Sequence, residues 1–359
     1  MVNFTILAGG YSSAVVTYLF NSDAGALSVV GQSPTGTNPS WIALHPTNQS
    51  ILYATNENTE GGLQSFVIKD DGLLTDALAT VSSGGNGPAF AIPLSTGELA
   101  GMNFGSGNGV IVPTEEDPTQ FVSGAPVITF PAPPAPAVSH PHMALEVGSE
   151  VFVPDLGADT IHRLVRDGPA GNFKVQGEIE QPAGSGPRHI VVRGDQLYTI
   201  HELASTLTQQ TIPADPSVPS APLAANLSIV PPGLPAGASM AAAELLLAEA
   251  SPAPGSNFTQ AFLYASNRNV GAQDPRGDAI AIFALEPQLA LVKHVFTGLD
   301  QIRGMQLSGG PENEYIVAAG VAGSAGTVVL RRTNGGADLE IVATNTDVPT
   351  RSSFVWLSD

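Results

Sequence analysis

The stretch GPRHIVVRGDQLYTIHEL, residues 186–203, gathers four side chains that could bind an anion and move protons. They are Arg188, His189, His201 and Glu202, and they flank a short apolar run. A guanidinium group can hold a carboxylate or a phosphate through two parallel hydrogen bonds. Histidine and glutamate side chains can transfer protons when their surroundings adjust their pKa values. Because the chain contains only 13 Lys and Arg residues, we predict that this stretch contributes to an anion-binding site.

The charge and composition of the chain exclude several kinds of partner and chemistry. There are 32 acidic residues and 13 basic residues, and the formal net charge of −19 repels nucleic acids and anionic membrane surfaces. The absence of cysteine excludes disulfides and thiolate ligands. No spacing of His and acidic residues is typical of a metal site, so we expect neither a metal nor a cofactor. The first twenty residues lack the pattern of an export signal, so we expect a cytoplasmic protein.

A hairpin pattern repeats along the chain. Each copy has a short apolar strand, a polar or glycine-rich turn and a second alternating strand. The copies recur about every 45 residues. The seven copies occupy residues 6–20, 52–68, 99–112, 151–165, 197–211, 263–283 and 315–332. This period predicts an all-β fold, a seven-bladed β-propeller of four-stranded antiparallel blades.

The two chain ends are expected to close one blade of a single domain spanning residues 1–359. The first hairpin has no strand before it, while residues 351–359, RSSFVWLSD, form a lone predicted strand. A Pro/Ala-rich insertion is expected around residues 212–240. The AAAELLL segment that follows, residues 241–247, could form a helix on propensity alone. The repeat pattern predicts instead that this segment is the innermost strand of a blade.

Equivalent positions in different blades of a propeller converge on the central channel. Charged side chains occupy these positions in several repeats, when the positions are counted from the residue that anchors each hairpin. We expect four of them, from three blades, to meet at one end of the channel: His142, Arg188, Glu202 and Arg268. One small anion should reach two of them through hydrogen bonds of about 3 Å. The same channel should include Glu57, Glu244 and Arg303, whereas outer strands or turns should carry Arg193, Lys293 and Arg331.

These charged groups could serve the structure alone or bind a ligand. In the first case Arg188, Arg268 and Arg303 only neutralise the nearby glutamates in an ion-pair network that plugs the channel. In the second case the guanidinium groups form an anion-binding cleft, beside which His142 and Glu202 transfer protons. Charge in such apolar surroundings is costly unless it is paired or used.

Several motifs together resemble the signatures of the lactonase family of seven-bladed β-propellers. In chain order they are NPSWIALHP, SHPHM, VFVPDLGAD, GPRHIVV, LYTIHEL and LYASNRN. The family includes bacterial 6-phosphogluconolactonase and the fungal 3-carboxy-cis,cis-muconate cyclase. The resemblance covers essentially the whole chain, and it implies the same propeller fold that the hairpin repeat predicts.

The resemblance also implies site residues, one position at a time. HPHM contains two candidates for the family's site histidine, His140 and His142, of which His142 fits the blade spacing. The family's Gly-Pro-Arg-His motif is matched by Arg188 and His189. The Ser-Asn-Arg motif is matched by Arg268.

Three features depart from the family pattern. The Asn-Glu-Leu motif is matched by Glu202, but His201 stands in place of the asparagine. Arg303 lies in QIRG, which lacks the proline of the family's Pro-Arg-Gly motif. The Pro/Ala-rich insertion has no counterpart in the repeat. We expect His201 and the insertion to lie near the cleft, where they would alter which substrates fit.

The resemblance implies a metal-independent lactonase that acts on a small anionic lactone, of a sugar acid or carboxylate, or on its open acid. The expected catalytic residues are His142, Glu202, Arg188 and Arg268. The expected substrate-binding residues are His140, His189, Glu57, Glu244 and Arg303. Two alternatives stay open: a carboxymuconate-type cycloisomerase, and a non-catalytic propeller that binds a ligand or protein through its loops. The oligomeric state is open as well.

Overall fold

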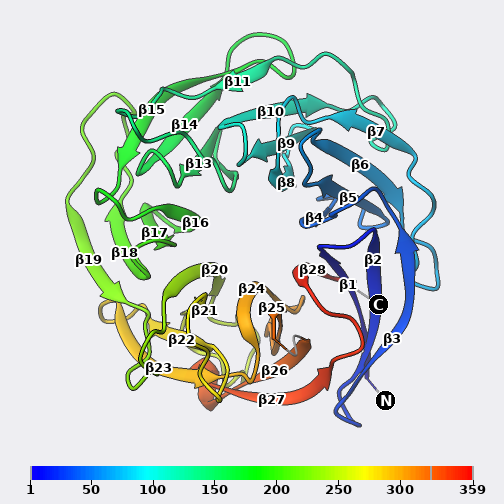
Figure 1. The fold of residues 1–359 in the computed structure, drawn as a ribbon, viewed down its shortest axis with the longest axis vertical. Helices are drawn as coiled ribbons and strands as arrows, with labels where there is room; N and C mark the ends of the chain where they lie inside the picture. Colours follow the sequence, from blue (N-terminus) through cyan, green and yellow to red (C-terminus); the bar gives the residue numbers. More distant parts are fainter. Residues whose placement is uncertain (1, 324–325, 358–359) are drawn as a thin grey trace.

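The chain forms a ring of seven four-stranded sheets around a central channel (Figure 1). The computed structural model describes residues 2–323 and 326–357. Neighbouring strands within every sheet are antiparallel, and each sheet forms one blade. The prediction of an all-β seven-bladed propeller is therefore confirmed.

The first four blades are described from the innermost strand outwards. Blade 1 contains β28 (Arg351–Leu357), β1 (Asn3–Gly10), β2 (Ala14–Asn21) and β3 (Ala26–Pro34). Blade 2 contains β4 (Ile42–Leu44), β5 (Ile51–Asn56), β6 (Gly62–Val67) and β7 (Ala79–Ser82). Blade 3 contains β8 (Pro88–Pro93), β9 (Glu98–Asn103), β10 (Asn108–Pro113) and β11 (Val127–Thr129). Blade 4 contains β12 (Leu145–Val147), β13 (Glu150–Asp155), β14 (Thr160–Arg166) and β15 (Phe173–Glu180).

The last three blades follow in the same order. Blade 5 contains β16 (Pro187–Arg193), β17 (Gln196–His201), β18 (Thr206–Thr211) and β19 (Leu223–Ser228). Blade 6 contains β20 (Met240–Ala248), β21 (Phe262–Asn269), β22 (Ala279–Ala284) and β23 (Ala290–Phe296). Blade 7 contains β24 (Asp300–Leu307), β25 (Tyr315–Ala322), β26 (Thr327–Thr333) and β27 (Asp338–Asn345), with the short 3-10 helix η1 (Asn334–Gly336). In the part of the chain that the structure describes, no helix is long and apolar enough to cross a membrane.

Strands from both ends of the chain complete blade 1. Ile6 in β1 pairs with Tyr18 in β2 on one side and with Trp356 in β28 on the other. The prediction that one blade is closed by both termini is confirmed. The AAAELLL segment lies within β20, the innermost strand of blade 6, as the repeat predicts. The Pro/Ala-rich stretch around residues 212–240 includes β19, the outermost strand of blade 5.

Apolar side chains fill the space between neighbouring blades. The middle strands β5, β9 and β21 are buried along their whole length, because a neighbouring blade covers each of their faces. The outer strand β19 alternates between exposed and partly buried residues, as a strand with one face in solvent does. The tyrosines that anchor the hairpins, Tyr53, Tyr198 and Tyr264, are all buried. The blades therefore form a rigid frame for the residues at the channel.

The innermost strands of blades 7 and 1 approach each other closely at Gly304 in β24. A Cβ atom at this position would overlap the carbonyl oxygen of Ser352 in β28. Backbone atoms cannot move aside as the end of a flexible side chain can. Glycine at this position lets β24 pack against the strand that closes the ring.

Replacing Gly304 with alanine should therefore destabilise the propeller by about 1–3 kcal/mol, the usual cost of overpacking. The matched control is Gly309→Ala, because a Cβ atom at Gly309 meets no atom within 4 Å. Its effect should stay within about 0.5 kcal/mol. Urea denaturation of the two variants and the wild type measures both changes. Equal stability of the two variants would contradict the predicted clash.

Candidate functional site

Two arginines hold the carboxylate of Glu202 at one end of the channel. Arg188 Nε lies 2.8 Å from one carboxylate oxygen, and an Arg268 terminal nitrogen lies 2.7 Å from the other. Arg188 comes from β16 in blade 5, Glu202 directly follows β17 of the same blade, and Arg268 comes from β21 in blade 6. Both arginines are buried, whereas the Glu202 side chain is 19% exposed. The structure thus brings together three residues predicted from two blades.

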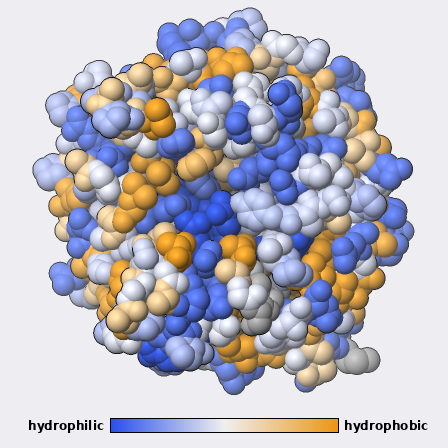
Figure 2. Space-filling model, viewed as in Figure 1, coloured by the Kyte–Doolittle hydropathy of each residue, from blue (hydrophilic) through white to orange (hydrophobic). Residues whose placement is uncertain are grey.

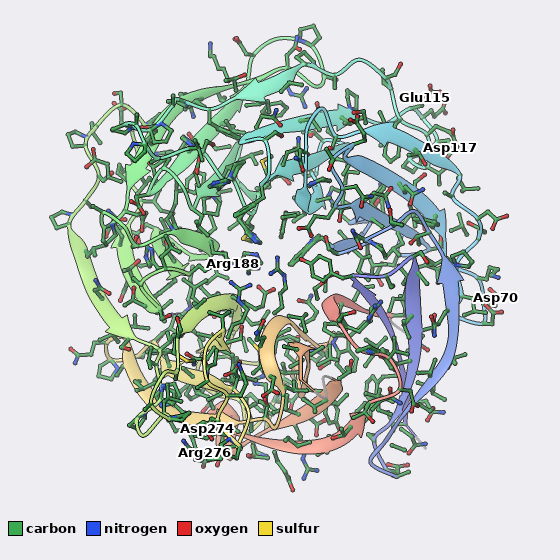
Figure 3. All side chains as sticks on the ribbon, viewed as in Figure 1. Asp70, Glu115, Asp117, Arg188, Asp274 and Arg276 are labelled. Carbon is green, nitrogen blue, oxygen red and sulfur yellow. The ribbon has the colours of Figure 1, made fainter. Side chains whose placement is uncertain are left out.

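Backbone irregularities present several of these side chains to the channel. The pairing of β16 with β17 shifts register between Pro187 and His189, at Arg188. The same kind of shift occurs at Arg303 in β24 and next to Glu244 in β20. A bulge redirects a side chain relative to regular alternation, and bulges are common beside functional sites. Figure 3 shows Arg188 at the inner edge of the ring, near its centre.

A second group of residues places imidazole rings beside the arginines. His189 Nδ1 lies 2.6 Å from Oε1 of Glu244, so blades 5 and 6 are joined by this contact as well. The ring centroid of His142 lies 5.1 Å from that of His189. Trp41 and Phe90, from the channel side of blades 2 and 3, pack edge-on against His189 at 5.5 and 5.8 Å. Aromatic rings therefore form one wall of the polar site.

The structure distinguishes the two histidines of HPHM. His140 donates a hydrogen bond from Nδ1 to the carbonyl oxygen of Phe104 and stacks on that ring at 4.6 Å. His142 is buried and lies within the electrostatic influence of Arg188, Arg268 and Arg303. Of the two, His142 is the ring that faces the charged groups.

Burial and the surrounding positive charge keep His142 neutral. Loss of solvent lowers the pKa of His142 well below 6.5, and Arg188, His189 and Arg303 lower it further. Burial alone would raise the pKa of Glu202, but the charges of Arg188 and Arg268 outweigh it and hold that pKa below its ordinary value. Burial lowers the pKa of Arg188 to about 10, so this guanidinium remains charged at neutral pH. The site therefore combines fixed positive charge with a neutral imidazole.

Tyr11 belongs to the site but was not predicted. The Arg303 guanidinium lies 5.3 Å from the centre of its ring. Burial raises the pKa of Tyr11 to about 12, an effect that Arg303 opposes and the Glu57 carboxylate reinforces. Tyr11 directly follows β1, just as Glu57 follows β5 and Glu202 follows β17. Tyr11 could have been predicted from the repeat if the same position had been counted in the first hairpin, which lacks a preceding strand in the sequence.

Several buried polar atoms at the channel have no hydrogen-bond partner among the described residues. They are Glu57 Oε2, His142 Nδ1, His189 Nε2, Glu244 Oε2 and Arg268 Nε. Leaving a buried polar group unsatisfied costs about 1–3 kcal/mol. Arg303 also makes no ion pair within residues 2–323 and 326–357. The ion pairs at Glu202 therefore leave donors and acceptors available, which a ligand can satisfy. Figure 2 shows hydrophilic residues gathered around the centre of the ring.

Two expectations about position are wrong. His201 does not turn toward the channel: its Nε2 lies 2.9 Å from Oγ1 of Thr208 inside blade 5, and burial lowers its pKa to about 4. Arg193, expected on an outer strand or turn, is the last residue of the innermost strand β16. It lies at the end of β16 opposite to Arg188 and pairs with Glu249 and Glu286.

The remaining predictions concern outer residues and metals. Lys293 lies in the outermost strand β23 and Arg331 in β26, and each forms an exposed ion pair away from the channel. Among the residues with described positions, no group of three or more His, Asp or Glu side chains is arranged to hold a metal ion. The side chains described at the channel carry guanidinium, imidazole, carboxylate and phenol groups.

Comparisons with known proteins agree with this architecture. A protein of Arthroderma benhamiae named "Probable 6-phosphogluconolactonase" is 25% identical over 327 residues, which cover 87% of this chain and 78% of that protein. A protein from Lactobacillus plantarum has the same fold, with a TM-score of 0.83 at 22% identity, covering 99% of this chain and 100% of that one. The periplasmic gluconolactonase of Pseudomonas aeruginosa matches with a TM-score of 0.80 at 20% identity, over 99% of each chain.

The family model described as "Lactonase, 7-bladed beta-propeller" matches residues 5–356, which include every residue of the channel site. This match spans all seven blades. The chain therefore belongs to the lactonase family of seven-bladed β-propellers.

Proposed function

We propose that this protein hydrolyses a small anionic lactone at the channel end that contains Glu202. One observation carries the proposal: three guanidinium groups surround a buried neutral His142, and only one carboxylate, Glu202, is ion-paired to them among the described residues. Arg303 keeps a guanidinium group without a carboxylate partner among the described residues, and such a group suits an anionic substrate and the oxyanion that forms during ester hydrolysis. The name of the Arthroderma benhamiae relative, a probable 6-phosphogluconolactonase, supports the same substrate class.

The geometry supports a division of roles among these residues. Arg303, which is free of carboxylate partners in the described chain, binds the acidic group of the substrate together with Arg268. Arg188 and Arg268 stabilise the negative charge on the former carbonyl oxygen, an effect typically worth about 3–4 kcal/mol. His142 accepts a proton from the attacking water and then returns it to the ring oxygen as the ester C–O bond breaks, so the ring is neutral again after each turnover. Arg188 and Arg268 stabilise the charged form of Glu202, and its carboxylate holds the two guanidinium groups in place.

Arg188→Ala should lower kcat/KM for a lactone substrate at least about a hundredfold, because the oxyanion loses a preorganised charged donor. The matched control is Arg193→Ala in the same strand, where the side chain pairs only with exposed glutamates at the end of β16 opposite to Arg188. Initial rates with 6-phosphogluconolactone and a panel of aldonolactones measure the effect. Absence of turnover with the whole panel would favour the non-catalytic alternative, a propeller that only binds ligands or proteins.

The pH dependence should report the protonation of His142. A base must be neutral to accept a proton, so kcat/KM should be constant near neutral pH and fall at acidic pH, with an apparent pKa below 6.5. His142→Gln should lower kcat by at least about a hundredfold and remove this acidic decline. Rates between pH 4.5 and 8 test both points, after correction for spontaneous hydrolysis of the lactone. An unchanged acidic decline in the variant would assign the base to another residue.

The cycloisomerase alternative requires an acid, and not a base, among the same residues. In that reaction a carboxylate adds to a conjugated double bond, and an acid protonates the neighbouring carbon. A histidine with a lowered pKa is not in its imidazolium form at neutral pH and is a poor acid for this step, which favours hydrolysis. The conjugated-diene absorbance of 3-carboxy-cis,cis-muconate should therefore stay constant at high protein concentration. Loss of the absorbance would assign the cycloisomerase reaction instead.

A further inference from the structure

A polar groove of about 750 Å3 opens beside the channel site, at the rim of blades 2 and 3. Its volume lies in the range of roughly 300–1,000 Å3 that small-molecule sites occupy. It is lined by the segment before β4, by the loop after β5 and by the loops around β8 and β9. These loops follow the same strand ends that carry Tyr11 and Glu202, so the groove opens on the face of the site.

Two residues belong to both the groove and the site. Glu57 lines the groove, and its carboxylate acts on the Tyr11 hydroxyl, which Arg303 also influences. Phe104 lines the groove and stacks on His140 at 4.6 Å, with its ring 5.6 Å from that of His142. A ligand bound at the arginines can therefore extend directly into the groove.

The residues of the groove have the chemistry that recognises a neutral, hydroxyl-rich ring. Thr59 provides a hydroxyl group, and Glu57 and Glu60 provide carboxylates that accept hydrogen bonds from hydroxyls. Asn38 donates a hydrogen bond to Asn58, and Asn58 donates to Thr37, so these amides hold the loops of the groove together. Glu57 Oε2 is buried and has no partner among the described residues.

The partly exposed ring of Phe104 can pack against the apolar C–H face of a sugar. No Lys or Arg lines the groove, and its two carboxylates would repel a second anionic group. The groove therefore lacks the guanidinium groups that the arginine site beside it provides.

We propose that the groove binds a glycosyl group attached to the substrate, so that the protein prefers the acid or lactone of a disaccharide to that of a single sugar. This inference rests on the proposed function. The acidic end of the substrate occupies the arginine site, while the second sugar ring lies between Phe104 and the carboxylates of Glu57 and Glu60.

Binding of open-chain acids tests this inference without requiring catalysis. Calorimetry should show at least one of cellobionate and maltobionate binding at least tenfold more tightly than gluconate. Thr59→Trp, which places a large ring in the groove from an exposed position, should reduce this preference at least tenfold. The matched control is Thr259→Trp, also exposed but in the loop between β20 and β21 at the other end of the strands. This control should keep the wild-type preference.

The possible outcomes separate this inference from the proposed function. If gluconate binds or glucono-1,5-lactone is hydrolysed, but neither disaccharide acid binds more tightly than gluconate, the groove inference alone is wrong. Equal effects of Thr59→Trp and Thr259→Trp would also overturn it. If a disaccharide acid binds through the groove and no lactone is hydrolysed, the inference holds and the proposed reaction fails. If none of the acids binds and no lactone is hydrolysed, both are wrong.

Discussion

The site depends on keeping three charges away from water at the end of a narrow channel. Glu202 accepts ion pairs from Arg188 and Arg268, and these three groups come from two different blades. Removing such ions from water is expensive, and their mutual attraction compensates only when the geometry is good. The positions of β16 and β21 must therefore be held accurately, which the apolar packing of Tyr198, Leu245 and Leu263 between blades 5 and 6 achieves. In this part of the ring, the apolar packing between blades therefore fixes the geometry of the ion pairs.

Irregular pairing in the innermost strands explains how a β-sheet fold presents so many polar groups at one place. Regular alternation would direct every second side chain of an inner strand into the apolar space between blades. The register shifts at Arg188 and Arg303 and beside Glu244 break this alternation in blades 5, 6 and 7. The shift in β16 lies at the start of the strand, and those in β20 and β24 lie near the middle of theirs. Irregular backbone pairing thus presents the polar side chains to the channel, while the rest of each strand packs regularly.

Much of the fold could be predicted because hairpin repeats are visible in the sequence as anchors, turns and alternation. The positions of Arg188, Glu202 and Arg268 followed from equivalent places in those repeats. The direction of a side chain is harder to predict, because it depends on bulges that leave no clear mark in the sequence. For this reason His201 was expected near the cleft although it bonds to Thr208, and the strand that carries Arg193 was misassigned. Tyr11 was missed because its blade begins at the other end of the chain.

The closure of blade 1 by β28 links completion of the site to completion of the ring. Arg303 precedes the closing strand in sequence, and its ring partner Tyr11 follows β1, so their contact crosses the seam between blade 7 and blade 1. Residues 6 and 356 pair within blade 1, and pairings of such long sequence separation slow folding. A nascent chain that lacks residues 351–357 has every charged group of the site but not the strand that lies between β1 and blade 7. The contact of Arg303 with Tyr11 is therefore completed only when the last strand has been synthesised, whereas the ion pairs of Glu202 need only blades 5 and 6.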